Sequence, residues 1–247
     1  MTPRLKHVTL LEQAVLALSL LLFCLLLVDP FMRERAVALP PEPTAFFRAI
    51  TDLGRSNWML ILSGAPLALA LILRRRHQYP KHAAAYGLIA STAGFVFASI
   101  AATVIVTNLA KGIVGRARPM LFDAGGALEF KLFAFSPEYA SLPSGHAANS
   151  FALATALGML WPRARVLLYT LAVWIAASRV LIGEHYFSDA VLGALLGIAI
   201  PHLVRDRFAA RGWLFERRQA GYRLRGARVR RWLGWPAVGE VRRTGAA

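Results

Sequence analysis

Long apolar runs alternate with short polar segments along most of this chain. Six runs nearly free of charge cover about residues 9–28, 57–73, 83–110, 146–161, 165–183 and 187–204. A run of about 20 apolar residues is typical of a membrane-spanning helix, and several such runs are not expected in a soluble domain. The second and fourth runs are short, which is tolerated when polar ends lie in the interface or neighbouring helices cover them. The pattern predicts an all-α bundle of six transmembrane helices.

Two of the polar connections have a pattern of their own. Residues 29–56 contain four prolines, and residues 44–57 alternate at roughly helical spacing, which predicts a short amphipathic helix on the outer interface. The connection 119–143 is 25 residues long, and loops of this length are usually functional or disordered. Its Gly125-Gly126 pair and its phenylalanines fit a partly inserted cap over a site; an ordinary surface loop is the alternative.

The basic residues are unevenly placed. The net charge is +16, which could indicate nucleic-acid binding, but twelve of the 29 Lys and Arg follow Val204 and all twelve are Arg. A basic segment beside a membrane span is a topology signal and a contact for anionic lipid. We therefore divide the chain into a membrane domain, 1–204, and a basic cytoplasmic tail, 205–247. The tail is expected to lie on anionic lipids of the inner leaflet, with disorder as the alternative, and no nucleic-acid partner is predicted.

Charge counting also predicts the orientation. With the N-terminus inside and six spans, 20 of the Lys and Arg lie inside and nine outside, in agreement with the positive-inside rule. Arg4 and Lys6 precede a first run longer than the apolar region of a usual signal peptide, with no clear cleavage site, so we expect an uncleaved anchor. The prediction is a multi-pass protein of the inner (plasma) membrane with both termini cytoplasmic.

The remaining chemistry lies at the outer ends of the runs, in three patches. They are Lys111-Gly-Ile-Val-Gly-Arg-Ala-Arg118-Pro119, then Pro143-Ser144-Gly145-His146, then Ser178-Arg179-x5-His185-x3-Asp189. All three fall on the extracytoplasmic (periplasmic) side of the predicted topology. The lone cysteine, Cys24, excludes an intrachain disulfide and is expected to pack in the first span. Oligomeric state has no signal in the sequence.

The third patch favours nucleophilic chemistry. His185 and Asp189 are four residues apart, so on one helix both side chains share a face, and the carboxylate can fix the tautomer of the imidazole. The other ring nitrogen is then free to attack phosphorus. A structural His–Asp pair at a helix start is the alternative. Arg179 can bind two phosphate oxygens through its guanidinium, or it can be an interfacial arginine.

The first two patches favour anion binding. Ser144 is a natural N-cap, Gly145 permits close approach of the backbone, and a helix start seats an anion. His146 in the same turn could give a proton to a departing alkoxide. Lys111 and Arg118 lie two helical turns apart, so they share a face if the helix continues to Pro119. Because a proline disfavours helical geometry at the residue before it, Arg118 is alternatively expected just past the helix end.

The balance of charge points to a substrate. Half-buried cations near a membrane need an anionic partner. Asp189 is expected to be committed to His185, and the patches contain too few other carboxylates, so we expect a substrate phosphate to supply the missing negative charge.

These three patches resemble the signature of the type 2 phosphatidic acid phosphatase (PAP2) superfamily, which also includes vanadium haloperoxidases. The resemblance spans residues 111–189 and implies roles for individual residues. His185 would attack phosphorus, Asp189 would orient it, and His146 would protonate the leaving oxygen. Phosphate oxygens would be held by Lys111, Arg118, Ser144, Gly145 and Arg179. The resemblance implies no metal and no cofactor.

The predicted function is an integral-membrane phosphatase that hydrolyses a lipid phosphate or diphosphate through a phosphohistidine. Candidate substrates are undecaprenyl diphosphate, phosphatidylglycerol phosphate, phosphatidic acid and lipid A phosphates. A haloperoxidase would hold vanadate in the same pocket, but a soluble architecture is expected there. A non-catalytic anion transporter or binding protein is the alternative from another class; it predicts charges at mid-span, whereas these lie at helix ends.

Overall fold

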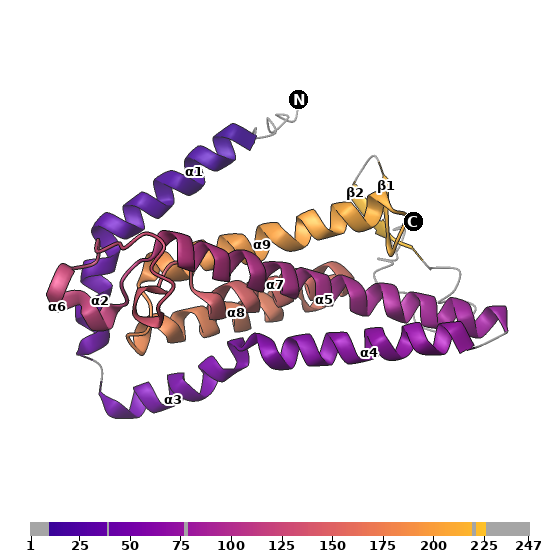
Figure 1. Cartoon of the computed structure of the whole chain (residues 1–247), viewed down its shortest axis with the longest axis horizontal. Helices are drawn as coiled ribbons and strands as arrows, with labels where there is room; N and C mark the ends of the chain where they lie inside the picture. Colours follow the sequence, from indigo (N-terminus) through magenta and orange to yellow (C-terminus); the bar gives the residue numbers. More distant parts are fainter. Residues whose placement is uncertain (1–9, 39, 77–78, 219–220, 226–247) are drawn as a thin grey trace, which may run out of the picture.

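Long helices running side by side form most of the molecule (Figure 1). The computed structural model describes residues 10–38, 40–76, 79–218 and 221–225. The bundle consists of α4 (Ser56–Arg76), α5 (Pro80–Val114), α7 (Gly145–Leu160), α8 (Arg165–Leu181) and α9 (Phe187–Ala210). The first span is α1 (Leu10–Phe23), a π-helical turn (Cys24–Val28) and α2 (Asp29–Val37). These helices match the six predicted runs, and the helical transmembrane fold is confirmed.

Five segments of the described chain are long and apolar enough to cross a membrane: Ala14–Ala36, Thr44–Arg76, Pro80–Val114, Pro162–Leu181 and Phe187–Ala210. The fourth predicted run, α7, is not among these five and has only 16 residues, or about 24 Å of helix. Most of its side chains are buried among the longer helices. It is therefore the central helix of the bundle, and its neighbours separate it from lipid.

Small residues let α9 lie directly against α7. Gly193 and Gly197 are four residues apart and face the first turns of α7. A side chain at Gly193 would reach within 2.5 Å of the carbonyl oxygen of Ser144, and one at Gly197 would overlap that of Ala148. This close packing is typical of small residues spaced four apart in membrane helices. It brings the start of α7 next to the start of α9, where the second and third patches lie.

The polar connection 29–56 is more helical than predicted. Helix α2 continues the first span as far as Val37, and α3 covers Pro41–Thr51. A proline cannot donate a backbone hydrogen bond, and the π-helical turn immediately before Asp29-Pro30 is a place where a helix can absorb that loss. Helix α3 matches the predicted amphipathic helix and leads into a 3₁₀ turn, η2 (Asp52–Gly54), before α4.

The long connection after α5 contains only short elements. They are η3 (Pro119–Leu121), α6 (Phe122–Gly125) and η4 (Pro137–Tyr139). Together with α2 and α3 this connection lies at one end of the bundle (Figure 1). The prediction of a loop is confirmed.

The opposite end holds a small hairpin that the all-α prediction missed. Strands β1 (Phe215–Arg218) and β2 (Gly221–Leu224) pair antiparallel. The boundary expected between residues 204 and 205 falls inside α9, and Phe208 and Phe215 pack on Phe95 of α5. The start of the tail is thus part of the folded core. The basic N-terminus and the tail from residue 226 lie outside the described residues.

Candidate active site

The first patch lies at the end of α5. Lys111 is in its last turn, and the helix stops at Val114 because Gly115 takes a left-handed conformation with φ 59°. A side chain at Gly115 would overlap the carbonyl oxygen of Lys131, so glycine is required there. Arg118 follows in extended backbone, as the proline after it favours. Of the two expected geometries, the structure has Arg118 past the helix end.

The second patch opens α7 as predicted, with one difference. Ser144 occupies the N-cap position, but its side chain makes no capping hydrogen bond. Its hydroxyl is buried and has no hydrogen-bond partner among the described residues. Ser144 is therefore the N-cap residue as predicted, but its side chain does not cap the helix. Its backbone N–H donates to the carbonyl of Asp189 (2.9 Å), which ties this turn to the start of α9. A buried hydroxyl without a partner is available to a ligand.

The same turn brings Lys111 and His146 to the site. The ammonium nitrogen of Lys111 lies 3.6 Å from the point where a side chain on Gly145 would begin, so glycine leaves room for this cation at the start of α7. His146 lies beneath η2, where a side chain on Gly54 would come within 2.9 Å of its ring. Thr51, just before η2, accepts a hydrogen bond from Arg179 (3.1 Å). The connection 29–56 therefore covers the site and joins its second and third patches.

The third patch joins the end of α8 to the start of α9. His185 is only 3% exposed, in the turn between the two helices, and Asp189 is fully buried in the first turn of α9. The Nδ1 atom of His185 lies 3.5 Å from Oδ2 of Asp189, close enough for electrostatic contact but without a hydrogen bond. The two side chains share a face, as their spacing predicts, and Nδ1 is the ring nitrogen turned toward the carboxylate.

The protonation state of His185 follows from its surroundings. Burial lowers the pKa of His185 to about 4, and the cations Lys111 and Arg118 add to this effect, while the Asp189 carboxylate opposes it. Below its pKa an imidazole is protonated and has no free lone pair; above it, the neutral ring can attack an electrophile. At neutral pH His185 is therefore neutral and keeps a lone pair for nucleophilic attack.

A buried ion-pair network beneath the site was missed in the sequence. Arg116 is fully buried and donates to Asp189 (2.6 Å), to Asp29 (2.8 Å) and to the Ser188 hydroxyl (2.7 Å). Asp29 also accepts from the backbone N–H of Ser188 (2.8 Å). Asp189 further accepts from the Ser141 hydroxyl (2.5 Å) and from the backbone N–H of Tyr186 (2.9 Å). The expectation that Asp189 is committed to His185 alone is wrong, because Arg116 is its closest charged partner.

A second unforeseen carboxylate lies among the cations themselves. One oxygen of Glu184 is 2.7 Å from the Arg118 guanidinium and 3.5 Å from that of Arg179. The Glu184 side chain is 44% exposed, so it can turn away into solvent. The expectation that the patches contain too few carboxylates is therefore also wrong: Glu184 joins the two arginines to one anion, as a phosphate could.

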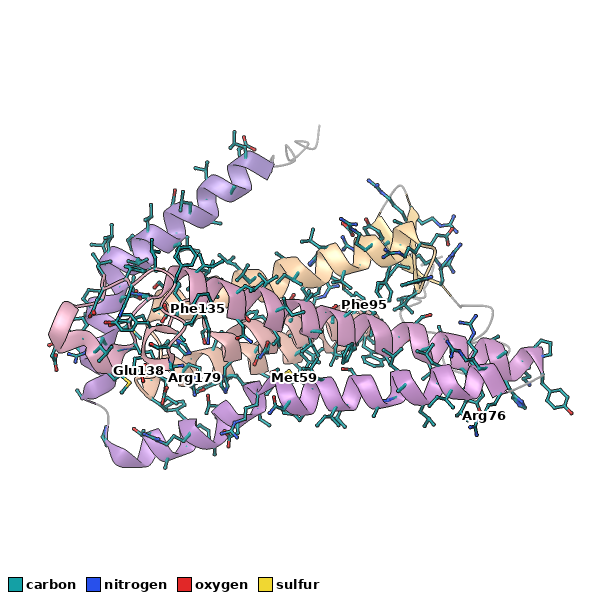
Figure 2. The ribbon with its side chains drawn as sticks, viewed as in Figure 1. Met59, Arg76, Phe95, Phe135, Glu138 and Arg179 are labelled. Atoms are coloured by element: carbon teal, nitrogen blue, oxygen red, sulfur yellow. The ribbon has the colours of Figure 1, made fainter. Side chains whose placement is uncertain are left out.

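The eight residues predicted for the site come together at one end of the bundle. Arg179 lies at that end, far from Arg76 at the other end (Figure 2). Direct contacts join Lys111 to Gly145, Ser144 to Asp189, and Asp189 to His185. In the described part of the chain, no three His, Cys, Asp or Glu side chains meet as a potential metal site. The site is a cationic cup in which His185 is buried as a neutral imidazole.

Comparison with known proteins agrees with this geometry. Residues 92–213, which include all three patches, match the family model described as the PAP2 superfamily. A lipid A 1-phosphatase of Rhizobium johnstonii is 31% identical over 180 residues, which cover 71% of this chain and 72% of that protein. A lipid A 1-phosphatase of Rhizobium etli is 30% identical over 71% of this chain and 75% of its own length. This chain belongs to the PAP2 superfamily.

Two solved structures support the membership at the level of the fold. The crystal structure of Aquifex aeolicus LpxE has a TM-score of 0.50 and 21% identity, over 71% of this chain and 92% of that one. A transmembrane PAP2 type phosphatidylglycerolphosphate phosphatase from Bacillus subtilis has a TM-score of 0.50 and 20% identity, over 80% of this chain and 96% of that one. The family match, the two Rhizobium relatives and the apolar helices together make this chain an integral membrane enzyme, a bacterial lipid phosphatase.

Proposed function

We propose that this PAP2 lipid phosphatase removes a phosphate from a lipid A-type substrate on the extracytoplasmic side of the inner membrane, through a phosphohistidine at His185. The observation that carries the proposal is the cup itself, in which three cations and a buried neutral imidazole meet at one end of a membrane bundle. The choice of lipid rests on the two Rhizobium relatives, both lipid A 1-phosphatases that match 71% of this chain.

The reaction would proceed in two steps. The Nε2 lone pair of His185 attacks phosphorus while Nδ1–H faces Asp189, and the bond from phosphorus to the lipid oxygen breaks. His146, protonated in the substrate complex because the phosphate charge offsets the neighbouring cations, gives that oxygen a proton. A water molecule then attacks the phosphohistidine, His146 accepts the proton of the water, and inorganic phosphate leaves with His185 restored. Lys111, Arg118 and Arg179 neutralise the phosphoryl oxygens, and the Ser144 hydroxyl and the Gly145 N–H donate to them.

The proposed orientation is supported by the distribution of charge. Arg74, Arg75 and Arg76 end α4 at the pole opposite the site. Arg76 and Arg179 mark the two poles in Figure 2. The hairpin near that same pole exposes Arg217, Arg218 and Arg223 (Figure 1). Because the positive-inside rule assigns such clusters to the cytoplasm, the cup opens on the other side, and the hairpin is placed to meet anionic inner-leaflet lipids.

A substrate panel tests the proposed function directly. Phosphate release by the purified protein is measured with a lipid A phosphate, phosphatidylglycerol phosphate, phosphatidic acid and undecaprenyl diphosphate, with the His185→Ala variant as blank. We expect the lipid A phosphate to have the highest kcat/KM. Preference for another lipid would overturn the substrate assignment, and no release from any of the four would overturn the proposed reaction.

Metal removal should leave the enzyme active. The cations of the cup would perform the charge neutralisation that Mg²⁺ performs in many phosphoryl-transfer enzymes. We therefore expect phosphate release in excess EDTA to stay within about twofold of the untreated rate, and addition of Mg²⁺ afterwards to give no stimulation. An enzyme that stops in EDTA and recovers with a divalent cation would contradict the mechanism.

Removing the carboxylate that joins the two arginines should strengthen phosphate binding. A substrate phosphate has to displace Glu184 from Arg118 and Arg179. Partly exposed ion pairs are worth about 0.2–1 kcal/mol, so Glu184→Gln should lower KM, and the inhibition constant of inorganic phosphate, by about twofold to fivefold.

Glu138→Gln is the control for that variant. Glu138 is an exposed carboxylate whose backbone carbonyl accepts from the Arg118 N–H (2.8 Å). Its substitution is expected to leave both constants unchanged. A rise in KM for Glu184→Gln would show instead that Glu184 holds the arginines in place for the substrate.

A further inference from the structure

The connection between the first two motifs exposes a group of apolar side chains beside the site. Leu132, Phe133 and Phe135 are 67%, 65% and 72% exposed. We name residues 132–135 the apolar strap. Exposed large apolar side chains in a contiguous group mark a surface that meets a partner or a membrane.

The strap is fixed to α5 by its backbone. The N–H of Lys131 donates to the carbonyl of Gly115 (2.7 Å), and that of Phe133 donates to the carbonyl of Ile113 (3.1 Å). The ring of Phe135 lies so close over Gly112 that any side chain there would overlap it. The strap therefore runs along the last turn of α5, level with Lys111 and the cup.

The backbone of the strap is held in an unfavourable conformation. Phe133 has φ 57° and Phe135 has φ 44°, both in the left-handed region that bulky residues rarely adopt. Such residues persist only where their surroundings enforce them, and they cluster at functional sites. Here the enforced conformation leaves both rings exposed instead of buried in the protein.

The strap continues a surface that already faces lipid. Ile105, Leu109 and Ile113 are exposed on the outer half of α5, within the membrane-spanning segment Pro80–Val114. Ile113 is the residue to which Phe133 is hydrogen-bonded, so the apolar surface passes from helix to strap without a break. Phe135 lies at the same end of the bundle as Arg179 (Figure 2).

We propose that the apolar strap inserts into the leaflet at the site's end of the bundle, with acyl chains as its partner. Phe and Leu side chains on the apolar face of an interfacial segment lie at the boundary between headgroups and acyl chains. Inserted there, the rings hold the cup at the height of lipid phosphates, so that a substrate reaches His185 without leaving the bilayer. The strap is then a membrane-contact surface that positions the enzyme toward its substrate.

Site-directed spin labelling tests where the strap lies. In a Cys24→Ala background, a label is placed at Phe133→Cys, at Phe135→Cys, and at Asp123→Cys, whose side chain is 89% exposed on α6 of the same connection. In proteoliposomes we expect the labels at 133 and 135 to collide with dissolved oxygen more than with a water-soluble nickel complex, and the label at 123 to show the reverse. Labels at 133 and 135 as accessible to nickel as the label at 123 would overturn the proposal.

Kinetics test what the insertion does. For Phe133→Ser/Phe135→Ser we expect KM for long-chain lipid phosphate in vesicles to rise about tenfold, and kcat/KM for a short-chain, water-dispersed lipid phosphate to stay within about twofold. Equal loss on both substrates, or no change on either, would overturn the proposal.

Two comparisons accompany that measurement. Val166→Ser/Leu167→Ser removes two equally exposed apolar side chains from the far end of α8 and is expected to leave both substrates unaffected. Hydrolysis of the dispersed substrate by the unsubstituted enzyme tests the proposed phosphatase reaction by itself, so failure of the reaction and failure of the strap are distinguishable.

Discussion

His185→Ala is expected to reduce phosphate release by at least about a thousandfold, because it removes the nucleophile from a site that retains its other groups. The rest of the cup stays in place, since Asp189 keeps its bonds to Arg116, Ser141 and the Tyr186 N–H. The variant should therefore still insert and still bind inorganic phosphate. Steady-state phosphate release on a lipid phosphate measures the loss.

Rapid quenching identifies the step that is lost. The unsubstituted enzyme should contain an acid-labile, base-stable phosphoryl group during turnover, and the His185→Ala variant should contain none. His202→Ala is the matched control, because His202 lies further along α9 with Nδ1 2.8 Å from the Ile198 carbonyl and takes no part in the proposed reaction. Turnover by His185→Ala close to that of the unsubstituted enzyme would refute the nucleophile assignment.

The membrane fold could be predicted because its physical cause is local. A bilayer imposes the same requirement on each span, so charge-free runs of sufficient length identify α4, α5, α8 and α9 one at a time. The run at α7 is also free of charge, but for a different reason. It is apolar because neighbouring helices bury it, with α9 admitted close by Gly193 and Gly197.

Much of the cup could also be located in the sequence. Its cations, histidines and Ser-Gly turn lie at helix ends that the topology places on one side. Helix-end signals, such as the glycine after Val114 and the proline after Arg118, limit where those side chains can be. For this reason the eight proposed site residues could be named before any coordinates were considered.

Pairings across long separations could not be predicted. Asp29 and Arg116 are 87 residues apart, and nothing in either segment indicates the other. The sequence places Asp29 at the start of a polar connection, and no periodicity there indicates that the first span continues through a π-helical turn into α2. The role of Glu184 could not be predicted either. Its partners Arg118 and Arg179 come from other elements, and its position beside His185 does not indicate that it pairs with them.

The hairpin and the Ser144 side chain were missed for a related reason. Strands of only four residues in a basic segment give no clear strand signal, and the hairpin depends on Phe215 packing against Phe95 of α5. Ser144 has the residue type of an N-cap, but a tertiary contact to Asp189 determines its turn. In both cases tertiary contacts determine the local structure, and local propensity alone does not predict it.

Arg116→Met is expected to have the second large effect, through stability. The variant leaves Asp29 and Asp189 fully buried without their common cation, and breaking a buried ion pair from one side typically costs about 3–5 kcal/mol. We expect a marked fall in the temperature at which the detergent-solubilised protein loses helical circular dichroism. Activity should fall as well, because Asp189 faces His185 and its position depends on Arg116.

Two further variants separate this network from a general loss of charge. Arg218→Met removes an exposed arginine that pairs with Glu216 (3.0 Å) in the hairpin, and exposed pairs contribute at most about 1 kcal/mol, so its unfolding temperature should hardly change. Adding Asp29→Asn to Arg116→Met removes one of the two buried carboxylates that lack a cationic partner, so the double variant should be more stable than Arg116→Met alone. Because Asp189 remains unpaired in the double variant, its activity should recover less than its stability. An Arg116→Met protein as stable and active as the unsubstituted enzyme would contradict the role of this network in both folding and catalysis.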